Sequence, residues 1–134
     1  ESTRPGAEPV GAADQLARLD GVLRAVREAP PSIALSVDTS LAPVAEAALD
    51  AGAVLVNDVT AGRADPGLLP LVAERGAAVC LVHMLGSPRT MQSDPRYGDV
   101  VAEVRDHLAA RLGAAVDARM PEEHVLLDPG LGSG

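Results

Sequence analysis

The 134-residue sequence predicts an α/β fold with a parallel β-sheet, on two observations. First, short apolar runs alternate with amphipathic stretches of helical length, which is the pattern of repeating strand–helix units. Second, the apolar runs do not alternate with polar residues, which predicts strands buried on both faces. The pattern leaves two architectures open, a doubly wound sheet or part of a (β/α)8 barrel.

The elements are predicted in the order helix, then strand–helix three times, then strand. The first helix covers 14–29 and has a stripe of Leu and Val at helical spacing. The strands are 32–38, 54–59, 78–84 and 125–128. A second helix is expected over 41–51, with Thr39 or Ser40 as its cap and Gly52 as its stop. A third is started by Asp65-Pro66 and ended by Gly76. A fourth runs from about Asp99 to Ala118.

Composition excludes several classes of function. A net charge of −8 with a single aromatic residue argues against a nucleic-acid partner, which requires a basic face. The apolar runs are too short to cross a membrane, and no charged leader precedes an apolar segment. Cys80 is the only cysteine, so we expect a cytoplasmic chain in which this thiol is buried and inert.

Polar side chains recur at the carboxyl end of each predicted strand, the face where parallel βα folds form ligand sites. Each has a structural explanation as well: Asp38 could cap the next helix, Asn57 could satisfy a loop, and His83 could be a hydrogen-bonded strand end. Their repetition favours a site. The residues are Asp38, Asn57 with Asp58, His83 and Asp128.

Carboxylates and an amide suit a ligand that donates paired N–H groups, such as an amino-pyrimidinone edge. The three histidines have no metal-ligand spacing. We expect His107 on a helix surface and His124 in the turn before the last strand. Polar loops with arginines accompany the rim, and for Arg63, Arg89 and Arg96 a ligand role and a solvated connector remain equally open.

Five motifs in family order resemble those of the dihydropteroate synthases of folate synthesis. They are ESTRPGA, similar to the second substrate loop of that family, and SVDTS, VNDV, LVHMLGSPRTMQ and LLDPGLG, similar to its third to sixth strand motifs. The chain thus resembles a central fragment, strands 3–6 with flanking loops and helices, in a single incomplete domain over 1–134. Since a full barrel takes roughly 250 residues, the resemblance implies a partial (β/α)8 TIM barrel, about half of it present.

The resemblance implies a transferase that condenses p-aminobenzoate with 6-hydroxymethyl-7,8-dihydropterin pyrophosphate, to give 7,8-dihydropteroate and pyrophosphate, assisted by magnesium (Mg2+). By motif, the pterin-binding residues are Asp38, Asn57, Val82 and Asp128. Those that bind p-aminobenzoate are Thr3, Arg4, Pro5 and Ser133, of which Thr3 and Arg4 are also catalytic.

Two residues depart from the family pattern: Val82 stands where a methionine is frequent, and Ser133 where an aromatic residue is usual. The family's metal-serving asparagine would precede Glu1, and its lysine and later phosphate ligands would follow Gly134; no Lys occurs here. No metal ligand is therefore assigned. We expect this chain alone to lack synthase activity and to be marginally folded or self-associated, because its outer strands would be unpaired.

Two alternatives stay open beside the synthase. One is a non-catalytic pterin-binding or assembly module from an inactive relative, which the departures at Val82 and Ser133 favour. The other is a methyltetrahydrofolate-dependent methyltransferase, which would not explain ESTRPGA. The expected partners are the two substrates, with no nucleic acid and no membrane, and the full-length protein is expected to be a homo-oligomer.

Overall fold

The computed structural model of the chain describes residues 4, 6–28, 33–87, 89, 91 and 96–133. Its helices are α1 (Ala12–Glu28), α2 (Ala42–Asp50), α3 (Leu68–Glu74) and α4 (Val100–Asp117), with a short 3-10 helix η1 (Glu122–His124). Its strands are β1 (Ser36–Asp38), β2 (Leu55–Asp58), β3 (Ala78–Val82) and β4 (Val125–Asp128). The element order matches the predicted alternation.

The strands form one parallel sheet in the order β1-β2-β3-β4. Strands that are consecutive along the chain are therefore neighbours in the sheet throughout. A doubly wound sheet reverses its strand order at a switch point, whereas the wall of a (β/α)8 barrel does not. The sheet confirms the predicted parallel α/β fold and is a section of barrel wall.

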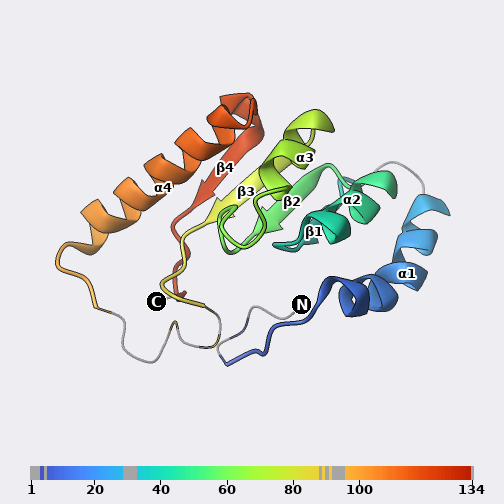
Figure 1. Cartoon of the computed structure of the whole chain (residues 1–134), viewed down its shortest axis with the longest axis horizontal. Helices are drawn as coiled ribbons and strands as arrows, with labels where there is room; N and C mark the ends of the chain where they lie inside the picture. The colour runs from blue at the N-terminus through green and yellow to red at the C-terminus, as the bar shows by residue number, and fades with distance from the viewer. Residues whose placement is uncertain are drawn as a thin grey trace.

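Helices α2, α3 and α4 lie on one side of the sheet, and α1 packs beside α2 (Figure 1). Strand side chains change face at every residue, so alternate residues of each strand point into this helical layer. Each large aliphatic side chain buried there contributes roughly 1.5–3 kcal/mol. The buried core of the described residues includes Val37, Val56, Val79 and Leu81 from the strands and Val44, Leu68 and Val72 from the helices.

The prediction that the strands are buried on both faces is wrong for the described residues. β1 alternates exposed, buried and exposed, and β2 and most of β3 alternate half-buried and buried residues. The described helices cover only one face, so Ser36 and Asp38 on the other face are exposed, and Leu126 is 49% exposed. This second face, the open face, carries the candidate site.

The first strand is shorter than the predicted 32–38. Residue 32 lies outside the described residues, and residues 33–35 are not strand. Ser36 pairs with Leu55, so the residues opposite 33–35 belong to the turn after α2 and cannot continue the ladder. The strands predicted at 54–59 and 78–84 also end earlier than expected, whereas 125–128 is confirmed.

The predicted N-cap of α2, Thr39 or Ser40, is wrong. The N-cap is Leu41, which makes no side-chain cap bond. The first amide of the helix, Ala42 N–H, instead donates to the Asp65 carboxylate from the loop before α3, at 2.8 Å. A carboxylate at a helix N-terminus also interacts favourably with the helix dipole, so a distant loop replaces the local cap.

The other helix ends largely follow the sequence. Gly52 and Gly76, with φ angles of 104° and 64°, lie just past α2 and α3, in a conformation that glycine adopts at low cost. α4 begins next to Asp99, where its start was predicted, and the Asp99 side chain caps it by accepting the Ala102 N–H. The predicted start of the third helix at Asp65-Pro66 is wrong: α3 begins at Leu68 with Gly67 as its N-cap, and Asp65 instead accepts the Gly67 N–H in a turn before the helix. α1 begins two residues before the predicted 14, and the predicted end at 29 lies outside the described residues.

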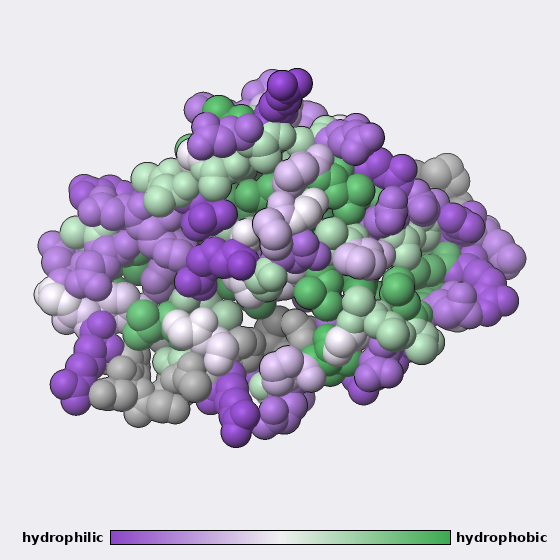
Figure 2. All heavy atoms as spheres, in the orientation of Figure 1, coloured by the Kyte–Doolittle hydropathy of each residue, from purple (hydrophilic) through white to green (hydrophobic). Residues whose placement is uncertain are grey.

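The surface reflects this layering. In the view of Figure 2, hydrophilic side chains gather over α4 and over the far end of α1, and hydrophobic ones gather between them. None of the helices that the structure describes is both long enough and apolar enough to cross a bilayer.

Candidate functional site

The open face of the sheet brings together polar residues that the sequence places at strand ends. Asp38 pairs in register with Asn57, Asn57 pairs with Cys80, and Val82 pairs with Asp128. Paired residues of parallel strands share a face, as do residues two apart on one strand. Asp38, Asn57, Cys80, Val82 and Asp128 therefore lie on one face of the sheet, opposite the helical layer, with Val82 and Asp128 two residues further along their strands than the other three. Together these five residues are called the strand-end row.

Asp38 and Asn57 contact each other directly. Asn57 Nδ2–H donates to Asp38 Oδ1 at 3.1 Å. Asp38 is exposed and Asn57 is half-buried, and their remaining side-chain oxygens accept no hydrogen bond from another described residue. The alternative in which Asp38 caps α2 is not observed, because the first amide of that helix bonds to Asp65. The pair thus leaves side-chain acceptor oxygens on the open face.

Asp128 is oriented by the loop that follows it. Its Oδ1 accepts the Gly130 N–H at 2.7 Å, and its backbone oxygen accepts the His83 N–H at 2.8 Å. Gly130 has a φ of 68°, and a Cβ at this position would lie 1.9 Å from the His83 carbonyl oxygen. Only glycine permits this approach of the loop to β3, and the approach fixes the turn that holds the Asp128 carboxylate.

Cys80 lies within the strand-end row, so the prediction that it is buried is wrong, whereas its inertness stays a prediction. It is half-buried and free. Burial raises the pKa of its thiol, and the Asp128 and Asp38 carboxylates raise it further, so the thiol form is favoured. A period of two along β3 was the available signal, because buried Val79 and Leu81 place Cys80 on the opposite face.

Asp58 does not belong to the row, although the sequence groups it with Asn57. One residue further along β2, it points into the helical layer and is fully buried. Its carboxylate accepts hydrogen bonds from Ser40 Oγ–H (2.5 Å), Thr60 N–H (2.8 Å), Thr60 Oγ1–H (2.8 Å) and Gly62 N–H (2.6 Å). A buried carboxylate requires such compensation.

His83 also lies on the helical side, away from the row. Its buried ring is 5.0 Å from the His107 ring, edge to face, and 6.1 Å from the Tyr97 ring, measured between centroids. Burial lowers the pKa of both histidines, and the Arg63 guanidinium lowers both further. The predicted surface position of His107 is wrong because it packs on His83, whereas His124 precedes β4 as predicted.

The residues expected to bind p-aminobenzoate are described only in part. Thr3 and Pro5 lie outside the described residues, and Arg4 is exposed. In the same N-terminal loop, the Glu8 carboxylate lies 3.6 Å from the Arg89 guanidinium of the loop after β3. An exposed ion pair of this kind contributes about 0–1 kcal/mol, so it brings two loops together without fixing them.

Two further residues of the implied site lie near Asp128. Val82, next to it in register, is 6% exposed. Ser133 is half-buried, and its backbone oxygen accepts the Leu85 N–H at 3.1 Å, which joins the loops after β4 and β3. Arg63 donates to the backbone oxygens of Thr60 and Met84, at 2.9 and 3.4 Å. These bonds do not decide between a ligand role and a structural role for its guanidinium.

Gln15 is a buried polar residue that the sequence analysis missed. It is 2% exposed, and its Nε2–H donates to the Val10 oxygen at 2.7 Å. Its Oε1 accepts a hydrogen bond from the hydroxyl of Thr39 at 3.1 Å, and Thr39 is the residue directly after Asp38. The signal was a polar residue four positions before Leu19, on the apolar stripe of the first helix.

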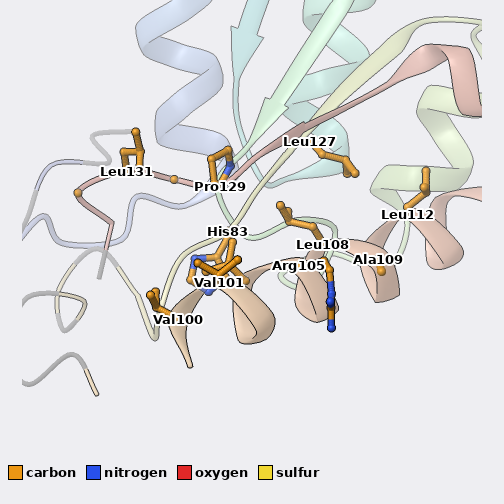
Figure 3. Close-up of a pocket in the computed structure, with 13 residues that line it drawn as sticks. His83, Val100, Val101, Arg105, Leu108, Ala109, Leu112, Leu127, Pro129 and Leu131 are labelled. Atoms are coloured by element: carbon orange, nitrogen blue, oxygen red, sulfur yellow. The ribbon is translucent and has the colours of Figure 1, made fainter. Parts of the chain in front are cut away.

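An apolar groove of about 650 Å³ lies between α4 and β4, away from the strand-end row. Leu108 and Leu112 of α4 line one side, Leu127 of β4 lines the other, and His83 lies at one end (Figure 3). Leu131 at its rim is 94% exposed. Apolar surface of this extent fits the expectation of a marginally folded or self-associated chain, which stays a prediction.

A metal site does not emerge from the described residues. Among them, no group of three or more His, Cys, Asp and Glu side chains could hold a metal ion. The row alone therefore does not fit Mg2+, which takes a near-octahedral set of oxygen ligands. No chemical step is derived from a metal.

The chain matches the family described as pterin binding enzyme over residues 1–134, and it belongs to that family. Its relatives include the dihydropteroate synthase of Mycobacterium leprae, 46% identical over 98% of this chain and 46% of the relative. The dihydropteroate synthase of Escherichia coli K12 is 40% identical over 100% of this chain and 47% of the relative.

Solved structures agree with this assignment. Burkholderia cenocepacia dihydropteroate synthase complexed with 7,8-dihydropteroate has a TM-score of 0.86 and 47% identity, over 100% of this chain and 47% of that chain. Yersinia pestis dihydropteroate synthase in complex with a sulfonamide drug has a TM-score of 0.91 and 39% identity, over 98% of this chain and 47% of that chain. The chain spans about half the length of the relatives it matches. The predicted half of a (β/α)8 barrel is confirmed.

Proposed function

We propose that these residues form the pterin-binding wall of a dihydropteroate synthase. In the reaction, the amine nitrogen of p-aminobenzoate attacks the methylene carbon of 6-hydroxymethyl-7,8-dihydropterin pyrophosphate. The bond from that carbon to oxygen breaks, pyrophosphate leaves with the electron pair, and the nitrogen loses a proton. The products are 7,8-dihydropteroate and pyrophosphate. The solved relative with bound 7,8-dihydropteroate supports this proposal, as does another complexed with 4-aminobenzoic acid.

The observation that carries the proposal is the strand-end row, with two carboxylates and one amide on a single face. A pterin presents adjacent N–H groups on its amino-pyrimidinone edge, and carboxylate oxygens accept such pairs through strong charge-assisted hydrogen bonds. As pyrophosphate leaves, positive charge develops on the pterin. Asp38 and Asp128 are placed to stabilise that charge, and Asn57 to fix the orientation of the ring.

The remaining residues take the roles that the family motifs imply. Val82 supplies an apolar surface against the pterin, and Ser133 borders the p-aminobenzoate. Thr3, Arg4 and Pro5 belong to a loop that closes over p-aminobenzoate after the pterin is bound. Arg4, with Thr3, acts in catalysis, because its positive charge suits the aminobenzoate carboxylate and the departing pyrophosphate.

The dependence of the full-length protein on magnesium, its homo-oligomeric state, its cytoplasmic location and the absence of nucleic-acid and membrane partners stay predictions. The free, half-buried Cys80 is compatible with a reducing compartment. The non-catalytic alternative is not favoured, because the named relatives are dihydropteroate synthases. The departures at Val82 and Ser133 are then variations within an active family.

Calorimetric titration of the full-length protein with a dihydropterin tests the proposal. Asp128→Asn should weaken binding by at least about tenfold, because an amide presents a donor where the pterin requires an acceptor. Asp117→Asn, at the exposed C-terminal end of α4, is the matched control and should leave the affinity unchanged. Equal affinity of Asp128→Asn and the unsubstituted protein would reject the assignment.

A further inference from the structure

A fully buried carboxylate stands directly behind the strand-end row. Asp58 is 0% exposed and follows Asn57 in the chain, with its side chain on the opposite face of the sheet. Nothing in the proposed chemistry uses it. Its carboxylate accepts four hydrogen bonds, from two hydroxyls and two backbone amides, three of them at Oδ1 and one at Oδ2.

These donors come from two different loops. Ser40 belongs to the loop between β1 and α2, whereas Thr60 and Gly62 belong to the loop between β2 and α3. Ser40 lies two residues after Asp38, and Asp58 itself lies one residue after Asn57. The Asp58 carboxylate thus connects the ends of the two strands that carry the first pair of the row.

The row by itself has little to hold its geometry. Asp38 and Asn57 share one hydrogen bond at 3.1 Å, on a face that the described helices leave open. An exposed bond of this kind contributes only about 0.5–1.5 kcal/mol. A binding site needs its groups held within roughly 0.5 Å of the productive geometry. Thr39, buried and bonded to Gln15, holds only the end of β1 by its side chain, whereas the buried bonds to Asp58 join the chain after Asp38 to the chain after Asn57.

We propose that Asp58 is a positioning residue, which holds Asp38 and Asn57 in the arrangement that receives the pterin. This inference rests on the proposed function. Asp58 does not touch the ligand, since it lies on the other face of the sheet. It acts through the strand ends: Ser40 carries the constraint to Asp38, and the peptide unit between Asn57 and Asp58 carries it to the amide.

Asp65 provides a matched control. Its carboxylate joins the loop between β2 and α3 to the start of α2: it accepts the Ala42 N–H at 2.8 Å and, within its own loop, the Gly67 N–H at 2.9 Å. It is half-buried and lies next to no residue of the row. Both substitutions therefore weaken hydrogen bonds between separate segments of the chain. Only Asp58→Asn does so next to a residue of the strand-end row.

The experiment compares both variants in the full-length protein by dihydropterin titration, urea unfolding and the nitrogen–proton NMR signal of the Asn57 side-chain amide. Asp58→Asn should lower the affinity for dihydropterin by about tenfold or more and shift the Asn57 signal. The new side-chain NH2 group would face the N–H and O–H groups that now donate to the carboxylate. Asp65→Asn should lower stability while the affinity stays within about twofold and the Asn57 signal stays in place.

Equal losses of affinity in the two variants, or an unchanged Asn57 signal in Asp58→Asn, would overturn the proposal. If Asp58→Asn does not fold, Ser40→Ala takes its place, since it leaves the carboxylate with three donors. Ser40→Ala should shift the Asn57 signal and lower the affinity by a smaller factor; no effect on either would overturn the proposal. Failure of the unsubstituted protein to bind dihydropterin would reject the proposed function, and the Asn57 signal would still decide whether Asp58 positions the pair.

Discussion

Asn57 and Asp58 are consecutive polar residues at the end of one strand, and the sheet places them in opposite environments. Asn57 is half-buried on the open face, with one side-chain hydrogen bond to Asp38. Asp58 is fully buried under the helices, and its carboxylate accepts four hydrogen bonds. A polar group on the covered face must be satisfied within the protein, whereas one on the open face keeps acceptors for a ligand.

β3 repeats this contrast. Cys80 lies on the open face within the row, and His83, just past the strand end, is buried among ring side chains on the helical side. Polarity at a strand end therefore does not by itself identify a binding residue. The face of the sheet on which the residue lies must be known as well.

The largest effect is expected where the two faces meet, at Gly130. Gly130→Ala places a Cβ 1.9 Å from the His83 backbone oxygen, at a φ of 68°. Overpacking and left-handed strain together should lower the free energy of unfolding by about 4 kcal/mol. Because the same loop orients Asp128, dihydropterin affinity should fall as well. Urea unfolding and calorimetry of the full-length protein measure both.

Gly132 is the control for this substitution. It also has a positive φ, of 87°, but a Cβ there meets nothing within 4 Å. Gly132→Ala should therefore cost only the backbone strain, about 1–2 kcal/mol. Similar losses in the two variants would show that the contact with the His83 oxygen is unimportant.

A second test compares leucines on the two faces of neighbouring strands. Leu81 is fully buried beneath the helices, whereas Leu126 on the open face is 49% exposed. Leu81→Ala should lower the free energy of unfolding by about 3 kcal/mol, because it leaves a cavity. Leu126→Ala should cost less than about 1 kcal/mol in this chain, since less apolar surface is lost from the interior. Comparable losses measured by urea unfolding would contradict one-sided burial.

The smallest effect concerns pH and the histidines of the covered face. Burial holds the pKa of His83 and of His107 below the usual 6.5. The unfolded chain then binds more protons than the folded one as pH falls below about 6.5. This contribution to stability is complete above that pH and is lost as pH falls toward the folded pKa.

Urea unfolding at about pH 7.5, 6.5 and 5.5 measures this dependence. His107→Gln should flatten it, because a neutral amide replaces one of the two rings. His124→Gln, in η1 before β4, should leave it unchanged. The expectation fails if all three proteins lose stability equally as the pH is lowered.

The sequence by itself determined the features that depend on neighbouring residues. The alternation of strands and helices predicted the α/β class, glycines predicted two helix ends, and the pattern from about Asp99 predicted the start of α4. The carboxyl ends of the strands located Asp38, Asn57 and Asp128. Each of these follows from periodicity or from a hydrogen bond within a few residues, which any short stretch of the chain carries.

Only the tertiary structure decided which face each polar residue occupies and what satisfies it. Ser40 reaches Asp58 across 18 positions of sequence, and Asp65 replaces the expected local cap of α2 from 23 positions away. Such partners meet only after the strands have paired and the helices have packed. Burial and hydrogen bonding on the covered face are therefore set by contacts distant in sequence, which local pattern does not contain.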